Sequence, residues 1–310
     1  MDPRLVVRVS ASTSNLGPGF DFLGLCLGLD LRAVAEVRAD ARTHGVQRAG
    51  TAAEWRPEDD LMLAALRAYE RRAGGALPPL TLSVESEIPV GRGFGSSGAA
   101  VAAALLLAAA VDERAGRTAL DRDALVEVAL EVEGHPDNGT ASLLGGCTLS
   151  VPRPGGVTVV RQPVHASLGF ALAWPEAPLF TDAARSALPA EVPLADAVEN
   201  PRRLALLLEG LRTGAPDLLE LGVVDRLHER FRRALIPGSD AACGAARDAG
   251  AFAACLSGAG SGLVAIGPAG GMEPIAVALA APLVGGTGRA VAFAPDPPSV
   301  HAEQRASERD

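Results

Sequence analysis

A glycine-spaced segment followed by a long apolar run constrains this chain more than any other feature. Residues 89–99 read Pro-Val-Gly-Arg-Gly-Phe-Gly-Ser-Ser-Gly-Ala and lead directly into an alanine- and leucine-rich stretch at residues 100–111. The pattern predicts a loop that feeds the N-terminus of a buried helix. Helix N-termini carry unpaired N–H groups and the positive end of a dipole, and glycines let a polyphosphate approach the backbone closely. We therefore expect an anion site here, the alternative being a tight turn that serves only close packing.

The lysine that would make this segment a Walker A loop is missing. Walker A loops carry a lysine before their Ser or Thr, and this chain contains no lysine at any position. Lysine-dependent phosphate sites and Schiff-base chemistry are therefore excluded. Positive charge at the site must come from arginine, a metal ion or the backbone.

Length and composition narrow the class of protein. A chain of 310 residues with 48% apolar residues is long enough for two domains with substantial cores. The formal net charge of −9 argues against partners such as nucleic acid or an anionic membrane. The cysteines, Cys26, Cys147, Cys243 and Cys255, form no CxxC pair, which favours reduced thiols. The first residues lack an apolar signal core and the longest apolar run, 99–111, is short for a membrane span, so we expect a cytoplasmic protein.

Strand and helix patterns alternate irregularly along the chain. Strands are predicted at residues 5–9, 31–37, 80–86, 168–174, 263–266 and 290–294, with a hairpin over 145–151 and 157–161. Helices are predicted from a cap at Asp59 or Asp60 through Arg72, from a cap at Asp121 or Asp123 to about Glu133, and at 194–211, 225–234 and 273–281. This order indicates the α+β class and not a Rossmann fold. We expect a first domain over residues 1–155, a second over 156–294 and a disordered tail over 295–310.

Three further polar segments carry candidate binding groups. Residues 10–21 are expected to form a loop after the first strand, and residues 131–139 read Glu-Val-Glu-Gly-His-Pro-Asp-Asn-Gly. A second glycine-rich turn, Leu-Ser-Gly-Ala-Gly-Ser-Gly at 256–262, opens into a strand. Each of the three alone is also typical of an ordinary turn or helix end.

Together and in this order, the segments resemble the GHMP kinase superfamily, and within it the homoserine kinase branch. The similarity is carried by Asn-Leu-Gly-Pro-Gly-Phe-Asp at residues 15–21 and by residues 89–99, 133–138 and 256–260. It implies a two-domain α+β fold, with an N-terminal domain like ribosomal protein S5 domain 2 and a ferredoxin-like C-terminal domain. It also implies transfer of the γ-phosphoryl group of ATP to the hydroxyl of L-homoserine, a step in threonine biosynthesis.

The resemblance implies that ATP and Mg²⁺ bind at the glycine-spaced segment. The expected ATP-binding residues are Pro89, Val90, Gly91, Arg92, Gly93, Phe94, Gly95, Ser96, Ser97, Gly98 and Ala99. Ser97 and Glu133 would bind Mg²⁺, which prefers oxygen ligands, and Glu131 is the competing carboxylate. Ser97, Glu133 and Asn138 form the expected catalytic set.

Homoserine is a zwitterion, so its pocket needs a carboxylate for the ammonium and guanidinium groups for the carboxylate. By resemblance, Asp21 binds the ammonium, Asn15 lies near the hydroxyl, and Arg185 and Arg232 bind the carboxylate. The alternative for each arginine is a solvated helix face. The remaining expected pocket residues are His135, Asp137, Asn138 and Gly260.

The sequence does not decide which residue, if any, acts as the general base, or which alcohol accepts the phosphoryl group. Asp137 can act as a base, but the homoserine branch lacks a dedicated base, with Asn138 at the corresponding position and the proton passing to the phosphate, and we favour that version. Alternative functions are a kinase of a mevalonate- or sugar-type alcohol and a non-catalytic regulator with the same fold. The resemblance to the family is also consistent with a homodimer.

Overall fold

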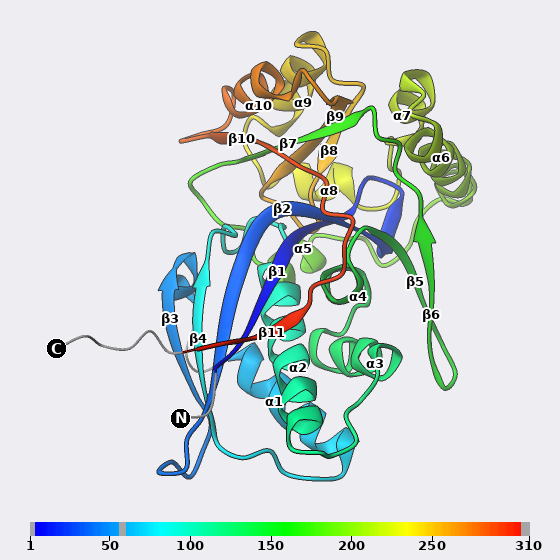
Figure 1. The fold of residues 1–310 in the computed structure, drawn as a ribbon. Coiled ribbons are helices and arrows are strands. Elements are labelled where there is room, and N and C mark those ends of the chain that lie inside the picture. Colours follow the sequence, from blue (N-terminus) through cyan, green and yellow to red (C-terminus); the bar gives the residue numbers. More distant parts are fainter. Residues whose placement is uncertain (1–3, 56–59, 305–310) are drawn as a thin grey trace, which may run out of the picture.

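The chain forms two β-sheets, each covered by helices (Figure 1). The computed structural model describes residues 4–55 and 60–304. Within these ranges the larger sheet has seven strands and the smaller has four. Helices and strands are both abundant in each half, so the α+β class is confirmed.

The larger sheet gathers its strands from both ends of the chain. They are β1 (Arg4–Asn15), β2 (Gly19–Val37), β3 (Gly45–Gly50), β4 (Leu80–Ser86), β5 (Cys147–Arg153), β6 (Gly156–Gln162) and β11 (Val300–Glu303). The order is β11-β1-β2-β4-β3, and β5 pairs with the first part of β2 and with β6. All these pairings are antiparallel except that of β3 with β4.

The smaller sheet has the ferredoxin-like order. Its strands, all antiparallel, run β10 (Thr287–Val291), β7 (Leu168–Trp174), β9 (Leu263–Pro268) and β8 (Ala253–Leu256) across the sheet. Along the chain, β7, α9 (Ser239–Asp248), β8, β9, α10 (Met272–Ala280) and β10 follow one another, which is the βαββαβ pattern. Between β7 and α9 the chain inserts α5 (Thr181–Ser186), α6 (Leu194–Thr213), α7 (Pro216–Gly222) and α8 (Glu229–Arg233).

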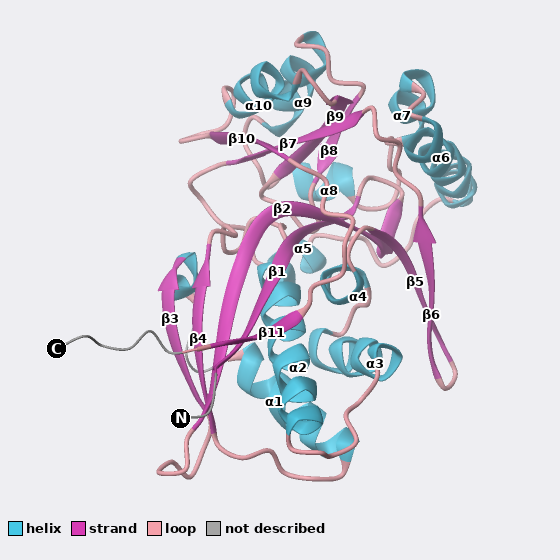
Figure 2. Cartoon of the chain, viewed as in Figure 1, coloured by secondary structure: helices cyan, strands magenta, loops and turns pink. Residues whose placement is uncertain are grey.

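The apolar run after the glycine-spaced segment forms the central helix of the larger core. Helix α2 (Ser96–Arg114) packs on β1 and among α1 (Leu61–Ala73), α3 (Arg122–Glu133) and α4 (Asp137–Leu144). Figure 2 shows these helices together on one side of the larger sheet. By length and composition α2 could cross a membrane, but 78% of that stretch is buried inside the protein. It is therefore the buried helix that the sequence predicts.

Two predicted helix starts are confirmed by their caps. The carboxylate of Asp60 accepts the N–H of Leu63 at 3.0 Å, and that of Asp121 accepts the N–H of Ala124 at 2.9 Å. Asp59, the other candidate for the first cap, lies outside the described residues. Such side chains satisfy N–H groups that have no partner inside the helix.

The loop expected over residues 10–21 is wrong for most of its length. Residues 10–15 continue β1, and β2 already begins at Gly19, so only residues 16–18 connect the two strands. The polar side chains that suggested a loop are buried and hydrogen-bonded to other segments, as at Ser12 and Ser14. The predicted helix at 225–234 shortens to α8, and the sequence patterns gave no prediction for β3, β8, α4, α5, α7 and α9.

The chain after residue 295 returns to the first sheet. Because Val300–Glu303 pairs with Arg4–Val7 as strand β11, the expected disorder is wrong for this segment, whose backbone is ordered by the edge of β1. The expected division between residues 155 and 156 falls in the turn between β5 and β6, two strands of one sheet. That division stays a prediction, while the change of sheet comes after Gln162.

Candidate active site

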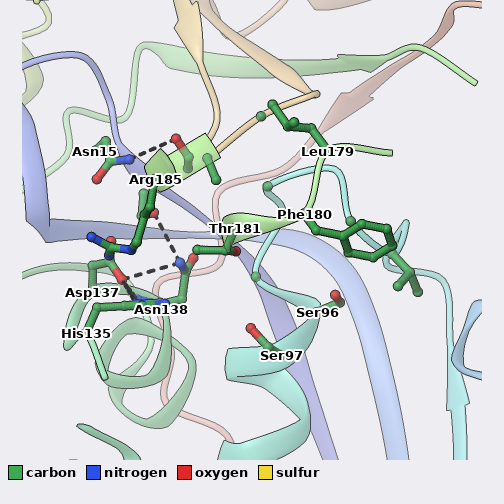
Figure 3. A pocket seen from close by; sticks show the side chains of 18 of the residues that line it. Asn15, Ser96, Ser97, His135, Asp137, Asn138, Leu179, Phe180, Thr181 and Arg185 are labelled. Atoms are coloured by element: carbon green, nitrogen blue, oxygen red, sulfur yellow. Dashed lines mark hydrogen bonds and ion pairs between the residues drawn. The ribbon is translucent and has the colours of Figure 1, made fainter. Parts of the chain in front are cut away.

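A cavity of about 240 Å³ lies where the glycine-spaced segment meets the segments between β7 and α9. Its walls come from the β1–β2 turn region, the segment before α2, the start of α4, α5, α8 and the turn between β8 and β9. Figure 3 shows Ser96 and Ser97 at the start of α2 and, on the other side of the view, His135, Asp137 and Arg185. The segments that sequence analysis singled out therefore converge on one cavity.

One end of the cavity is made by the N-terminus of α2. The lining residues of the glycine-spaced segment are Val90, Gly91, Gly93, Gly95, Ser96 and Ser97. The cap position is Gly95, with a left-handed φ of 68°, and none of the described side chains caps the helix. The N–H groups of the first turn have no partners within the helix, so this end is suited to an anion.

The glycines also serve close packing, as the alternative interpretation of this segment predicts. A Cβ on Gly93 would lie 1.9 Å from the carbonyl oxygen of Ser257, and one on Gly95 would lie 2.1 Å from Oγ of Ser12. Both glycines have φ near 70°, a region that side chains disfavour. The segment is thus pressed against β1 and against the β8–β9 turn.

The other expected ATP-binding residues, Pro89, Arg92, Phe94, Gly98 and Ala99, do not line the cavity. The guanidinium of Arg92 donates to the carbonyls of Val90 and Glu176. Phe94 is buried edge-on to Trp174, with ring centroids 5.5 Å apart. These side chains hold the segment in its shape.

Ser97 and Glu133 form the candidate metal pair. Oγ of Ser97 donates to Oε1 of Glu133 at 3.0 Å, and Oε2 of Glu133 is buried with no hydrogen-bond partner among the described residues. Burial raises the pKa of Glu133 to about 7, although the charge of His135 and the Ser97 hydrogen bond act in the opposite direction. Glu131 is exposed and pairs with Arg71 at 2.7 Å, so only Glu133 of the two candidates reaches Ser97.

His135 and Asp137 form a partly buried ion pair at the start of α4. Nδ1 of His135 lies 2.7 Å from Oδ1 of Asp137, which also accepts the N–H of Asn138 at 2.7 Å. Burial acts to raise the pKa of Asp137, but these partners outweigh it and hold the pKa below its usual value. Burial acts to lower the pKa of His135, but Asp137 outweighs it and raises that pKa to about 9. Asp137 is therefore a stabilised anion and a weak base.

The amide of Asn138 is held by two serines of β1. Its Oδ1 accepts from Oγ of Ser12 at 2.8 Å, and its Nδ2 donates to Oγ of Ser14 at 3.1 Å. Sequence reasoning missed both serines because it assigned them to a loop. As a strand, alternate residues 10, 12 and 14 share one face, and that periodicity is the signal that could have found them.

The other end of the cavity carries charged side chains from distant segments. Asp21 and Arg185 form a two-bond ion pair, with both N–O distances 2.9 Å. Arg232 is 2% exposed, which excludes the solvated-face alternative for this arginine. Asn15 lines the cavity, but its amide donates to the carbonyl of Gly258 at 2.8 Å and accepts the N–H of Asp21 at 3.0 Å. Gly260 also lines the cavity.

Ten lining residues were not among the predicted site residues. Four of them, Ser14, Ala100, Gly258 and Ala259, lie in segments that the sequence singles out, and the other six are Trp55, Asp60, Leu61, Leu179, Phe180 and Thr181. In Figure 3, Phe180 and Thr181 are drawn just above Ser96 and Ser97, and Leu179 lies farther from them. The N–H of Leu179 donates to the carbonyl of Gly91 at 2.8 Å, which ties this segment to the glycine-spaced segment. Nothing in the local sequence marks the six residues from Trp55 to Thr181 as cavity residues, because they belong to loops and element starts with ordinary composition.

Family models match both halves of the chain. Residues 60–146 match the model described as GHMP kinases N terminal domain, and residues 197–284 match GHMP kinases C terminal. The chain is 42% identical over 265 residues to the homoserine kinase of Streptomyces coelicolor, covering 85% of this chain and 84% of that protein. It is 35% identical over 277 residues to the homoserine kinase of Trichormus variabilis, covering 89% and 90%.

Solved structures support the same fold. The homoserine kinase of Cytophaga hutchinsonii superposes with a TM-score of 0.85 at 23% identity, covering 97% of this chain and 98% of that one. The phosphomevalonate kinase of Streptococcus pneumoniae superposes with a TM-score of 0.67 at 14% identity, covering 96% and 99%. At these identities the likeness establishes the fold alone.

Proposed function

This chain belongs to the GHMP kinase family, and from that premise we propose that it transfers the γ-phosphoryl group of ATP to the hydroxyl of L-homoserine, giving O-phospho-L-homoserine for threonine biosynthesis. One observation carries the proposal: a single cavity joins the N-terminus of α2 to the oppositely charged pair Asp21 and Arg185. The first end suits phosphates and the second suits a zwitterionic amino acid. The relatives at 35–42% identity that are named homoserine kinase support the same acceptor. As an enzyme of amino-acid biosynthesis, it would act in the cytoplasm.

ATP is proposed to bind with its phosphates at the start of α2. The N–H groups of Gly95, Ser96 and Ser97 lie at or next to the helix N-terminus and beside the cavity. A lysine-free chain must neutralise phosphate charge by such backbone groups, by arginine or by a cation. Phosphoryl transfer requires mainly positioning and charge stabilisation, which this end can supply.

Mg²⁺ is proposed to bind at Ser97 and Glu133. The fit rests on the donor set, a hydroxyl and a carboxylate 3.0 Å apart, and on the buried Oε2 of Glu133, which has no partner among the described residues. Hard oxygen ligands of this kind suit Mg²⁺, which neutralises charge on the β- and γ-phosphates when bound. The chain itself contributes a carboxylate held ready beside the phosphate end.

Homoserine is proposed to bind by exchanging an ion pair. Its ammonium replaces Arg185 as the partner of Asp21, and its carboxylate takes Arg185 and Arg232 as partners. The side chains of Asp21 and Arg185 are 36% and 38% exposed, so water and substrate can reach the pair. The exchange keeps both Asp21 and Arg185 paired with an opposite charge, which limits the cost of desolvation.

The proton of the substrate hydroxyl is proposed to pass to the transferred phosphate. Asp137 is a poor base because His135 and the N–H of Asn138 already stabilise its anion. Asn138 has its amide orientation fixed by Ser12 and Ser14, so it can orient the hydroxyl without taking the proton. The fixed amide favours the mechanism without a dedicated base.

A coupled ADP-release assay with Mg²⁺ and ATP tests the proposed function. L-homoserine, mevalonate, L-serine and galactose are compared at equal concentration. We expect turnover with homoserine far above the other three. Preference for mevalonate or galactose would keep the family and overturn the acceptor, whereas no turnover with any of them would favour the non-catalytic alternative.

A further inference from the structure

His228 links the turn between β1 and β2 to the guanidinium of Arg232. The residue occupies the N-cap position of α8, and its side chain is fully buried. Nε2 lies 2.9 Å from the carbonyl oxygen of Gly17, and Nδ1 lies 3.2 Å from Nη1 of Arg232. The imidazole therefore connects a backbone group of the first motif to a side chain of the cavity wall that is far away in the sequence.

The two partners determine the protonation of the ring. A guanidinium can only donate, so Nδ1 of His228 accepts from Arg232. A carbonyl oxygen can only accept, so Nε2 carries the hydrogen and donates to Gly17. One donor and one acceptor make a neutral imidazole. Asp225 is the nearby carboxylate, but its Oδ1 is 3.8 Å from Nε2, and its Oδ2 accepts the N–H groups of residues 227–229.

Phe20 keeps the imidazole and the guanidinium in place. Its ring stacks on His228 with centroids 4.8 Å apart and planes inclined by 20°. The guanidinium carbon of Arg232 lies 5.0 Å from the centroid of the same ring. Phe20 directly precedes Asp21, the proposed ammonium partner, so one turn of the chain orients groups for both ends of the amino acid.

The remaining partners of Arg232 are neutral as well. Its Nη1 also lies 3.3 Å from the carbonyl of Gly258, and its Nε lies 3.5 Å from that of Ala184. Among residues 4–55 and 60–304, no carboxylate forms an ion pair with Arg232, whereas Arg185 is paired with Asp21. Neutral acceptors orient a guanidinium without cancelling its charge, so that charge stays available to an anion in the cavity.

We propose that His228 is a positioning residue, a neutral imidazole that aims Arg232 at the carboxylate of the amino-acid substrate. The inference rests on the proposed function for the identity of the substrate. It goes beyond that function in assigning carboxylate recognition to a residue that does not line the cavity. The consequence is that loss of His228 weakens binding of acceptors that carry a carboxylate and leaves binding of ATP unchanged.

Three variants separate the two hydrogen bonds. His228→Phe keeps a flat ring against Phe20 and removes both bonds. His228→Asn can present its amide oxygen where Nδ1 lies and so restores the acceptor for Arg232. His228→Gln extends its amide to where Nε2 lies and restores the donor to Gly17. Thermal unfolding of each variant separates loss of fold from loss of positioning.

The readout is kcat/KM for L-homoserine divided by kcat/KM for 3-aminopropan-1-ol, the same amino alcohol without its carboxylate. In His228→Phe we expect this ratio to fall by about tenfold to a hundredfold through KM for homoserine, with KM for Mg-ATP within about twofold of the parent. His228→Asn recovers most of the ratio, and His228→Gln recovers less. An equal loss for both alcohols, or better rescue by Gln than by Asn, overturns the proposal.

Nitrogen-15 NMR of the imidazole tests the tautomer in the unsubstituted protein and does not depend on the fold of any variant. We expect His228 to be neutral at pH 7, with hydrogen on Nε2 and a bare Nδ1. A hydrogen on Nδ1, or an imidazolium, overturns the inference. Failure of the proposed function looks different, because the unsubstituted protein then releases no ADP with homoserine. In that case the assignment of Arg232 to a substrate carboxylate falls with the proposed function. The observed tautomer of His228 still tests whether its Nδ1 accepts from Arg232.

Discussion

The two ends of the cavity are built in different ways. The proposed phosphate end comes from one continuous segment, from Val90 to Ser97, that runs straight into α2. The amino-acid end collects Asp21 from β2, Arg185 from α5 and Arg232 from α8. The first end offers backbone N–H groups, and the second offers charged side chains. The comparison teaches that local sequence is enough to specify a helix start suited to an anion, whereas the proposed site for a zwitterion requires the tertiary fold.

The two arginines at the second end, Arg185 and Arg232, differ in their exposure and in their hydrogen-bond partners. Arg185 is partly exposed and forms an ion pair with Asp21. Arg232 is buried and is held by neutral acceptors alone among the described residues. In the proposed binding mode, Arg185 must therefore leave Asp21 before it can pair with a substrate carboxylate. Arg232 has no such partner to leave within the described part of the chain.

Glu133→Gln is the strongest test of the phosphate end. Removing one of the proposed Mg²⁺ ligands should lower kcat by about 10²- to 10³-fold, the usual loss when one preorganised electrostatic contact is removed. The matched control is Glu131→Gln, on the same helix but paired with the surface residue Arg71. Its kcat should stay within about twofold of the parent. Steady-state kinetics with ATP as the varied substrate checks both, and equal effects of the two variants would contradict the assignment.

Gly93→Ala tests whether the phosphate end depends on close packing. The new Cβ would lie 1.9 Å from the carbonyl oxygen of Ser257, at a φ of 71°. We expect a loss of about 3 kcal/mol in the free energy of unfolding, which lowers Tm by about 5–10 °C. Gly75→Ala is the control, because no atom of the described residues, its chain neighbours aside, lies within 4 Å of its new Cβ. Calorimetry that shows equal Tm values for the two variants would rule out the packing role.

Asp21→Asn tests the amino-acid end. Loss of the ammonium partner should raise KM for homoserine by about tenfold to a hundredfold and leave KM for Mg-ATP within about twofold. Asp40→Asn is a matched control, because Asp40 forms a similar two-bond pair with Arg38, at 3.0 and 2.9 Å, on the exposed strand end away from the cavity. If Asp21→Asn instead raises KM for ATP, the two ends are not independent.

The smallest expected effect is a pH dependence of stability in metal-free protein. Folding raises the pKa of Glu133 from its ordinary value of 4.5 to about 7, chiefly by burial. Between these pH values the folded chain binds more protons than the unfolded chain, so the contribution of this group to stability falls as pH rises. The Tm of the parent minus that of Glu133→Gln should therefore decrease from pH 5 to pH 7.5. A difference that grows over this range would contradict the buried, raised-pKa carboxylate.

Much of the fold could be predicted where a local pattern suffices. The strands at 80–86 and 168–174 have the predicted bounds, and Asp60 and Asp121 cap their helices as predicted. The errors arose where tertiary contacts overrode local composition. Ser12 and Ser14 look like loop residues until Asn138 supplies their hydrogen bonds, and the segment at 300–303 looks disordered until β1 supplies its partner.

The residues of the candidate site likewise fall into those that the sequence indicated and those that depend on tertiary contacts. The glycine-spaced segment and the polar run at 131–139 stand out by their residues, and the resemblance to the family pointed to Asp21, Glu133, His135 and Asn138 within the matching segments. It could not find Trp55 or Phe180 as cavity residues, nor could it show that Glu131 turns to Arg71. Those facts depend on which face of a loop or helix meets another segment.

The sequence by itself determined a helix start suited to an anion, the core helix behind it, the absence of lysine chemistry and the resemblance to the family. The helix and its start follow from neighbouring residues, because hydrogen bonding and apolar periodicity along one segment act over a few positions. The resemblance rests on several motifs that occur in the same order. Only the tertiary structure decided which carboxylate faces Ser97, which partner holds Arg185, and how His228 orients Arg232. Each of these is a contact between segments far apart in the chain, and its energy exists only when folding brings them together.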